Sequence, residues 1–526
     1  MKRRTKLLTA LLLTMAAPAA AQGIEQFGVA DLAGAMADGR LTSEAAVRTY
    51  LARIDAMNRQ GPRLNAVIAV NPDAIAEART LDAERRAGKL RGPLHGVPLL
   101  VKDNVDVVGM PNTAGSLALA ANLPARDAPV IAALKAQGAL ILGKTNLSEW
   151  ANFRSNRSMS GWSAVGGLTR NPYALDRTTC GSSSGSGAGV AAGFAPGAVG
   201  TETDGSIICP SSMTGLVGLK PTMGAVPRTG IVPISHSQDI AGPMARSVRD
   251  VALLFSAMIA SDPADPVTRE ADAHKRDYAA ALDPAVIKGM RIGYVARGGQ
   301  PEWKARFAAA LDVLRAAGAI LIEVDQPKSK AMGDAEGDVL HCEFKTDLAA
   351  YLATTDPAKV PTRTLADLIA FNDAHKDAEL GLFDQDIFTK AEQTAGGDSA
   401  ACRKARATSL RLAGRQGLEH MLESSNVALI VMPSYGPAWP SDVVWGDQYE
   451  GPGGSTSMAA IGGFPHLTVP MGLAGSLPVG ISFLGPRWSE QRLLDVGYAY
   501  EQAAAIRITP SFAKTADAGP LLEGAR

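Results

Sequence analysis

The segment RDAPVIAALKAQGALILGKTN, residues 126–146, joins a helical pattern to a strand pattern and decides the fold class. Apolar residues recur at helical spacing over about 127–136, and Gly138 ends that pattern. The apolar run that follows, Ala139–Leu142, is typical of a strand buried on both faces of a sheet. The segment therefore predicts a helix, a glycine stop and a buried strand in direct succession.

The same succession recurs further along the chain, at FAAALDVLRAAGAILIEVD (307–325) and LEHMLESSNVALIVMPS (418–434). Another apolar strand is expected at MRIGYVA (290–296), and a capped amphipathic helix at Thr42. Helices that alternate with short apolar strands indicate an α/β fold, with a single large mixed β-sheet covered by helices on both faces.

One large domain is expected over residues 22–526, because no Pro/Ser/Gly-rich linker of any length divides the chain. Residues 263–410 differ in character, since they are charged, helical in pattern and short of glycine. We interpret this stretch as a helical insertion or flap on the large domain, and a separate domain is the alternative.

Residues 1–21 have the pattern of a signal peptide. Four basic residues within the first six positions precede the apolar run Leu7–Met15, and Ala19 and Ala21 form an A-x-A cleavage site. A membrane anchor is the alternative, but the run falls well short of the ~20 residues that span a bilayer. We therefore expect the mature chain to begin near Gln22 and to be periplasmic or secreted.

The chain carries 52 basic and 52 acidic side chains, so its formal net charge is zero. A neutral chain has no electrostatic reason to bind nucleic acid or an anionic membrane. Its cysteines show no Cys-x-x-Cys motif and no zinc spacing, and we expect no metal. Export permits disulfides, but the sequence does not assign pairs, and buried free thiols are expected. The cysteines are Cys180, Cys209, Cys342 and Cys402.

The stretch GSSSGSGAG, residues 181–189, admits three interpretations. A flexible linker is disfavoured because the stretch continues directly into apolar sequence. A phosphate-binding loop would end in Gly-Lys-Ser/Thr, which does not follow here. A hydrolase elbow with Ser183 as nucleophile fits G-x-S-x-G, but NPYALDRTTC (171–180) is a polar loop, where an elbow needs an apolar strand.

Two other segments supply reactive groups. In GTETDGSIICP (200–210), glycine and small polar residues precede Ser206, and consecutive backbone N–H groups there can bind an oxyanion. The hydroxyl of Ser206 needs a base. GPLHGVPLLVKDN (92–104) ends an apolar strand at Lys102, and burial would lower the pKa of this amine until it accepts a proton. A surface lysine that closes the strand is the alternative.

Five segments occur together in one order and resemble the amidase signature family over residues 25 to 505. They are GVPLLVKDN (96–104), LGKTNLSEWANF (142–153), CGSSSGSGAG (180–189), GTETDGSIICPSSMTGLVGLKPT (200–222) and SQDIAGPMARSVRD (237–250). Within that family, TETDGSI, NLSEWANFR and GWSA look most like the bacterial peptide amidases, which remove the C-terminal amide of peptides.

The resemblance implies a Ser-Ser-Lys triad. Ser206 matches the family's nucleophile, Ser182 the bridging serine that a cis peptide bond holds, and Lys102 the base. It implies no metal and no organic cofactor. The family's oxyanion hole corresponds to the backbone N–H groups of Thr203, Asp204, Gly205 and Ser206.

Three features depart from this pattern or compete with it. Ile208 stands where many members of the family have an arginine, so the pairing of that arginine must be replaced. A disulfide between Cys180 and Cys209 is possible but less favoured than apolar packing of both. A Ser-His-Asp triad with His95 or His466 is the generic hydrolase alternative, and we prefer structural roles for both.

The resemblance implies an amide hydrolase that releases ammonia from C-terminal amides of peptides or similar small amides through an acyl-serine intermediate. A general amidase for non-peptide aliphatic or aromatic amides is the alternative, as is an amidotransferase A-type subunit that supplies ammonia in a complex. A binding protein without catalysis is disfavoured by the intact triad. We expect a small-molecule or peptide amide as substrate, a monomer or homodimer, and neither nucleic acid nor, after signal removal, a membrane as partner.

Overall fold

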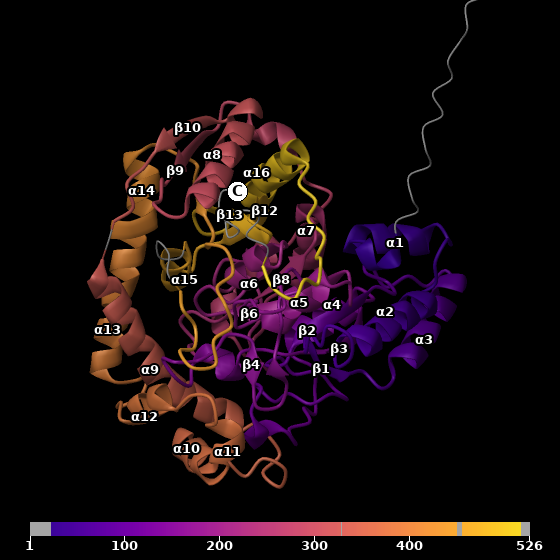
Figure 1. Ribbon diagram of the computed structural model, residues 1–526, viewed down its shortest axis with the longest axis vertical. Coiled ribbons are helices and arrows are strands. Elements are labelled where there is room, and N and C mark those ends of the chain that lie inside the picture. Colours follow the sequence, from indigo (N-terminus) through magenta and orange to yellow (C-terminus); the bar gives the residue numbers. More distant parts are fainter. Residues whose placement is uncertain (1–22, 328, 450–454, 517–526) are drawn as a thin grey trace, which may run out of the picture.

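The computed structural model describes residues 23–327, 329–449 and 455–516 (Figure 1). The expected signal peptide, residues 1–21, lies outside the described residues. Of the helices in the described ranges, none combines the length and the apolar character needed to cross a membrane.

A single sheet of eleven strands forms the centre of the molecule, in the order β1-β3-β2-β6-β8-β7-β12-β13-β11-β9-β10, and β4 pairs with β5 separately. The pairs β2–β3, β2–β6, β9–β11 and β9–β10 are parallel and the other neighbours are antiparallel. The prediction of one large mixed sheet in an α/β fold is confirmed. The strands are β1 Val67–Val70, β2 Pro98–Lys102, β3 Leu140–Thr145, β4 Trp162–Ser163, β5 Gly167–Leu168, β6 Gly197–Glu202, β7 Val217–Lys220, β8 Ile240–Ala245, β9 Arg291–Tyr294, β10 Ile320–Glu323, β11 Leu429–Pro433, β12 His466–Ala474 and β13 Leu477–Leu484.

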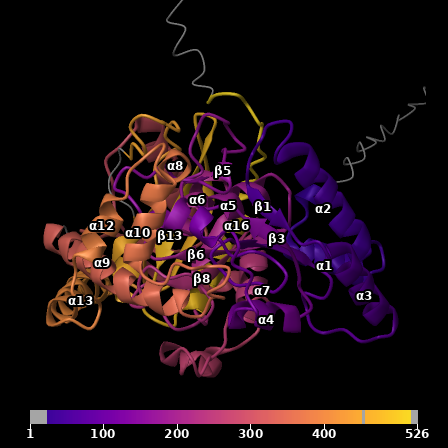
Figure 2. The same ribbon diagram turned by 90° about the horizontal axis from the view of Figure 1, so that it is seen from below.

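Helices flank the sheet. In both views α1, α2 and α3 lie at one end of the molecule, and α9, α10, α12 and α13 lie at the other (Figure 1, Figure 2). The helices are α1 Val29–Ala37, α2 Ser43–Met57, α3 Ala74–Arg86, α4 Pro129–Ala136, α5 Ser184–Ala191, α6 Ile208–Met213, α7 Val248–Met258, α8 Pro301–Ala316, α9 Lys330–Leu352, α10 Leu365–Ala374, α11 Lys376–Glu379, α12 Asp386–Glu392, α13 Ala400–Ala413, α14 Glu419–Ser424, α15 Ser457–Gly462 and α16 Glu490–Ala504.

The segment 126–146 folds as the helix α4 and the strand β3. The helix begins at Pro129, two residues later than predicted, because proline has a fixed φ and no N–H and therefore suits a first helical turn. The strand continues beyond Leu142 to Thr145, because it pairs with β1 on one side and β2 on the other. Lys144 is buried in this extension and forms an ion pair with Asp103 at 3.0 Å.

Residues 263–410 contribute to two parts of the molecule. The strands β9 and β10, with α8 between them, form one edge of the large sheet. The helices α9, α10 and α12 instead contribute to a second apolar core, in which Phe344 and Leu348 meet Trp150 of the short 3-10 helix Glu149–Asn152. Arg154 is fully buried nearby and bridges Glu149 at 2.5 Å to Glu379 at 3.4 Å.

The expectation of buried free thiols is wrong, because the four cysteines form two disulfides. Cys342 of α9 is bonded to Cys402 of α13 within the helical region. Cys180, before α5, is bonded to Cys209 of α6. Folding brings the Cα atoms of Cys180 and Cys209 to within 5.9 Å of each other, a distance that a disulfide can bridge, although 29 positions separate the two residues in sequence.

The serine-glycine stretch forms the end of a loop and the helix α5, which is buried along its whole length. A β-carbon on Gly185 would lie 2.6 Å from the carbonyl oxygen of Asn146, closer than real side chains approach. The stretch is therefore a close-packed helix and not a linker.

We predict that Gly185→Ala destabilises the fold by about 1–3 kcal/mol, the usual cost of forcing an extra group into a packed interior. Thermal unfolding measures the effect. Gly337→Ala is the matched control, since that glycine lies within α9 with open space around its α-carbon, and alanine favours helices. Equal melting temperatures for the two variants would contradict the close packing of α5.

Candidate active site

Lys102 ends β2 in the large sheet, and its side chain is fully buried. Its Nζ lies 2.8 Å from Ser182 Oγ, 2.9 Å from Thr201 Oγ1 and 3.3 Å from the carbonyl oxygen of Thr201. In the described part of the chain no carboxylate forms an ion pair with this amine. The lysine is therefore not the surface lysine of the alternative interpretation, and its partners are neutral oxygens.

Burial lowers the pKa of Lys102 to about 7, because the charged ammonium loses its hydration. The negative charges of Asp239 and Glu202 oppose this shift at longer range. A large fraction of the amine is therefore neutral at pH 7, and the neutral form dominates above that pH. A neutral amine has a lone pair that can accept a hydroxyl proton, whereas an ammonium can only donate.

Ser182 lies directly before α5 and is fully buried. The peptide bond between Gly181 and Ser182 is cis, as the resemblance implies. The carbonyl oxygen of Ser182 accepts a hydrogen bond from the backbone N–H of Ser148 at 3.2 Å. This hydrogen bond holds the backbone of Ser182 against the segment that follows β3.

Ser183, the nucleophile of the elbow interpretation, has a different environment. Its hydroxyl donates to the carbonyl oxygen of Thr201 at 3.0 Å and accepts from the backbone N–H of Thr201 at 3.2 Å. The side chain is fully buried. The hydroxyl of Ser183 therefore joins α5 to β6 and is not an exposed nucleophile.

Ser206 lies in the turn between β6 and α6 and is 8% exposed. Its carbonyl oxygen accepts from the backbone N–H of Ser183 at 3.2 Å, so the turn and the Ser182 loop lie side by side. The Cys180–Cys209 disulfide joins the same two segments covalently. The fold thus brings Lys102, Ser182 and the Ser206 turn into one region.

The backbone N–H groups of this turn are available. In the part of the chain that the structure describes, those of Asp204, Gly205 and Ser206 donate to no protein acceptor. Gly205 has a φ of +84°, and a β-carbon there would lie 2.5 Å from Tyr435 Oη. Glycine alone tolerates this conformation and this close approach without strain. The turn can therefore present several N–H groups to one anionic oxygen.

Two carboxylates hold the turn from behind. Glu202 Oε2 accepts from the N–H groups of Ile207 at 2.7 Å and Ile208 at 3.0 Å, at the start of α6. Lys220, which is also buried, supplies a positive charge that favours the ionised form of Glu202. Lys220 and the two N–H groups therefore balance the charge of this carboxylate without an arginine at position 208. Asp239 accepts from the hydroxyl of Thr203 at 2.5 Å, and burial raises the pKa of this carboxyl to about 6.

Neither candidate histidine belongs to the site. The ring of His95 bonds to the backbone of Leu81, with 2.9 Å between Nε2 and the carbonyl oxygen. His466 Nε2 lies 2.6 Å from Ser482 Oγ, and burial lowers the pKa of His466 to about 3. Among the hydrogen bonds of the described residues, neither ring contacts Ser206. Both histidines have structural roles.

Aromatic side chains from residues 435–449 lie beside the turn. The rings of Tyr435 and Tyr449 are 5.6 Å apart between centroids, as are those of Trp439 and Tyr449. Trp439 Nε1 donates to Asp447 at 3.0 Å. Because Tyr435 Oη borders Gly205, this aromatic cluster forms one side of the site.

Sequence reasoning missed Thr201, Glu202 and Gln238 as parts of the site. Thr201 and Glu202 are neighbours in β6, so they point to opposite faces of the sheet: Thr201 meets Lys102, and Glu202 meets α6. The alternation of side chains along a strand, applied to GTETDGSI, could have predicted that Thr201 and Glu202 face opposite sides of the sheet. Gln238, whose Nε2 lies 3.3 Å from the carbonyl oxygen of Thr203, belongs to the motif segment 237–250, but the sequence does not indicate which residue of that segment contacts the turn.

An amide hydrolase needs a base, a hydroxyl nucleophile and donors for an oxyanion. The site offers a buried amine, serine hydroxyls and a turn of unpaired N–H groups, all beside one sheet. The amidase family model matches residues 45–494, and the chain belongs to this family. It is similar to the native peptide amidase from Stenotrophomonas maltophilia, with 48% identity, a TM-score of 0.87 and coverage of 93% of this chain and 99% of the other.

Two curated relatives are more distant. A probable amidase of Arabidopsis thaliana is 38% identical over 505 residues, which cover 93% of this chain and 92% of the relative. The A-type subunit of the glutamyl-tRNA(Gln) amidotransferase of Roseiflexus sp. (strain RS-1) is 33% identical over 492 residues, 91% of this chain and 96% of the relative.

We predict that replacing both Cys180 and Cys209 by serine lowers stability by about 3–4 kcal/mol, the loop-closure value for 29 residues. It should also lower amide hydrolysis, because the disulfide joins the segments that carry Ser182 and Ser206. The matched control replaces Cys342 and Cys402, whose bond lies between α9 and α13. Thermal unfolding and kcat are measured for both. Equal losses of kcat in the two variants would contradict a special role for the first disulfide.

We predict that kcat/KM for amide hydrolysis rises with pH and levels off above about 7, because a protonated Lys102 cannot accept a proton from Ser182. Asp239 titrates nearby, with a pKa of about 6, and Asp239→Asn removes its contribution. A single rise should persist in that variant but move to lower pH, because the charge of Asp239 raises the pKa of Lys102. A profile that is flat from about pH 5 to 9 would show that no group of this pKa limits the reaction.

Proposed function

We propose that the protein hydrolyses the C-terminal amides of peptides, with Ser206 as nucleophile, Ser182 as proton relay and Lys102 as base. The observation that carries this proposal is the contact of 2.8 Å between the buried Nζ of Lys102 and Ser182 Oγ. Among the described residues this lysine has no ion-pair partner, and its lowered pKa makes it a base at neutral pH.

The reaction takes place in two halves. Lys102 accepts the proton of Ser182, Ser182 accepts that of Ser206, and the Ser206 oxygen attacks the carbonyl carbon of the amide. The proton then returns through Ser182 to the nitrogen, the C–N bond breaks and ammonia leaves. Water, deprotonated along the same route, attacks the acyl-serine and releases the carboxylic acid and the serine hydroxyl.

The turn stabilises the tetrahedral intermediate. The carbonyl oxygen becomes negative during attack, and the N–H groups of residues 203–206 are placed to donate to it. Each such donor contributes roughly 3–4 kcal/mol to the transition state. Glu202, Asp239 and the conformation of Gly205 hold these groups in position before substrate binds, so no reorganisation is needed at the moment of reaction.

Peptide amides are favoured as substrates by the similarity to the peptide amidase, which extends over nearly the whole of both chains. A general amidase for small non-peptide amides is the alternative. A role in an amidotransferase complex is supported only by the lower identity of 33%, and the expected signal peptide and zero net charge speak against it. We place the mature protein in the periplasm or outside the cell, on the basis of the signal-peptide pattern.

We predict that the purified protein alone releases ammonia from an amidated dipeptide, because its proposed base, relay and nucleophile all belong to one chain. Simple aliphatic and aromatic amides, assayed in parallel, test the alternative substrate class. A requirement for partner proteins would support the amidotransferase alternative.

A fluorophosphonate probe should label Ser206. Ser206→Ala should abolish labelling and hydrolysis, whereas the matched variant Ser183→Ala should retain labelling. Labelling that survives in Ser206→Ala but disappears in Ser183→Ala would restore the elbow interpretation.

A further inference from the structure

Three carboxylates of α9 lie on one face of that helix. Glu336, Glu343 and Asp347 are spaced by seven and four residues, which places them above one another along the helix axis. All three meet the segment 234–239, which precedes β8. The same segment contains Asp239, the partner of Thr203 in the Ser206 turn. The acidic face of α9 therefore contacts a segment that itself supports the turn.

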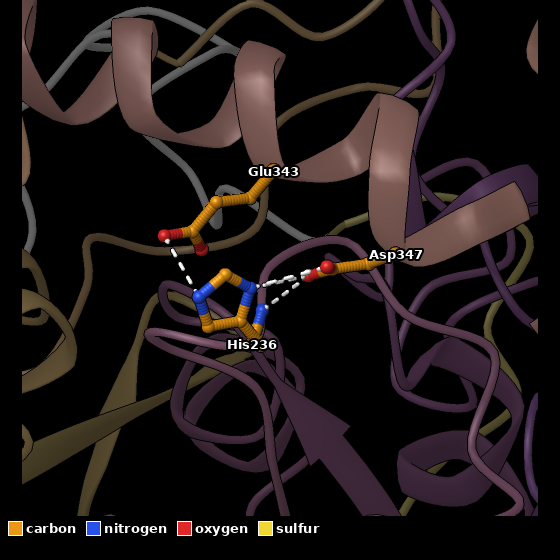
Figure 3. A group of neighbouring side chains, drawn as sticks. All are labelled: His236, Glu343 and Asp347. Atoms are coloured by element: carbon orange, nitrogen blue, oxygen red, sulfur yellow. Dashed lines mark hydrogen bonds and ion pairs between the residues drawn. The ribbon is translucent and has the colours of Figure 1, made fainter. Parts of the chain in front are cut away.

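His236 is held between two of these carboxylates (Figure 3). Its Nδ1 lies 2.9 Å from Asp347 Oδ2, and its Nε2 lies 3.4 Å from Glu343 Oε1. The hydrogen bond with Asp347 raises the pKa of His236. The two ring nitrogens face different carboxylates, and Glu343 also accepts from the hydroxyls of Ser235 and Ser237. This arrangement suits an imidazolium that fastens the segment to α9.

Gln238 continues the connection towards the turn. Its Nε2 lies 2.9 Å from Glu336 Oε1 and 3.3 Å from the carbonyl oxygen of Thr203. Gln238 is fully buried and Glu336 is 8% exposed, so water does not compete effectively for these bonds. One amide thus joins a carboxyl group of α9 to the first residue of the turn.

Glu336 also reaches the second residue of the turn, because its carboxyl group is hydrogen-bonded to that of Asp204. Two carboxylates cannot form a hydrogen bond, so one of the two groups carries a proton. Asp204 Oδ2 already accepts from the hydroxyl of Ser457 at 2.6 Å, and the side chain of Thr456 is a further hydrogen-bond partner of this carboxylate. These contacts suit an ionised Asp204 and a protonated Glu336.

The electrostatics agree with this assignment. Burial and the charge of Asp204 raise the pKa of Glu336 well above its ordinary value. Arg406 of α13 opposes the shift. Burial also raises the pKa of Asp204, but the hydroxyl donors and the positive charge of Lys220 favour its ionised form. Glu336 thus serves as a donor towards Asp204 and as an acceptor from Gln238.

We propose that Glu336, as a neutral carboxylic acid, is a positioning residue for the 203–206 turn. It binds the side chain of Asp204 directly and the backbone of Thr203 through Gln238, and so fixes the N–H groups that lie between these contacts and Ser206. The proposal rests on the proposed function of the turn in binding the oxyanion. It gives α9, which contains none of the five motif segments named above, a part in the reaction.

The role makes a specific kinetic prediction. Displaced oxyanion donors weaken the transition state and leave the binding of the ground-state substrate nearly unchanged, so kcat falls and KM does not. A residue that only supports the fold would instead change stability, and its replacement would not be rescued by a side chain of matching hydrogen-bonding capacity.

The test compares Glu336→Gln with Glu336→Leu. Glutamine donates to Asp204 and accepts from Gln238 as the neutral acid does, and its kcat should stay within about threefold of wild type. Leucine should lower kcat by about 10- to 100-fold at similar KM, less than the ~10²–10³-fold loss from deleting an oxyanion donor. Asp338→Asn, on an exposed position of α9, is the matched control and should leave both constants unchanged. Thermal unfolding is measured for every variant.

Two outcomes overturn the proposal. A large loss of kcat in a folded Glu336→Gln would show that a carboxylate is needed, and an unchanged kcat in Glu336→Leu would show that the contact is dispensable. If Glu336→Leu does not fold, Glu336→Ala takes its place with the same two criteria. Failure of the proposed function is distinguishable, because the wild-type protein would then release no ammonia from amidated peptides.

Discussion

The rest of the site depends on one constraint: an amine at the end of a central strand must stay uncharged while touching a serine hydroxyl. Nζ of Lys102 meets Ser182 Oγ at 2.8 Å in an interior that water does not reach. The sheet provides that interior, since β2 lies between β3 and β6. Neutral oxygens of Thr201 surround the amine, and the carboxylates of Asp239 and Glu202 act only at longer range. A direct ion pair would hold the proton on the lysine and remove the base.

Close backbone approach is the second requirement, and it explains the composition of the serine-glycine stretch. The Ser182 loop and the Ser206 turn must lie together, and the glycines at 185 and 205 stand where a β-carbon would collide with a neighbour. The Cys180–Cys209 disulfide and the hydrogen bond from Ser183 to Ser206 then join the two segments. Glu202 and Asp239 fix the turn from behind, so its N–H groups are oriented in the absence of substrate.

The sequence predicted the α/β sheet and the segment 126–146, because both depend on local pattern. The motifs pointed to Lys102 and Ser182, whose side chains meet at 2.8 Å, and to the Ser206 turn, whose backbone lies beside the Ser182 loop. The sequence did not predict the disulfides, since the pairing of Cys180 with Cys209 and of Cys342 with Cys402 depends on which loops meet. The sequence did not predict the contacts of Glu336 either. Its position in a charged helix resembles that of exposed Asp338, and only the packing of α9 on 234–239 distinguishes the two.

The central claim is that Lys102 is a neutral base, and its protonation can be observed directly. An NMR titration of protein labelled with ¹³C and ¹⁵N in lysine follows each side chain, and Lys102→Met assigns the signal among the buried lysines. The account predicts that this signal titrates near a pKa of about 7. Titration near the ordinary value of 10.5 would contradict the account, because the amine would then be charged at neutral pH and unable to accept a proton.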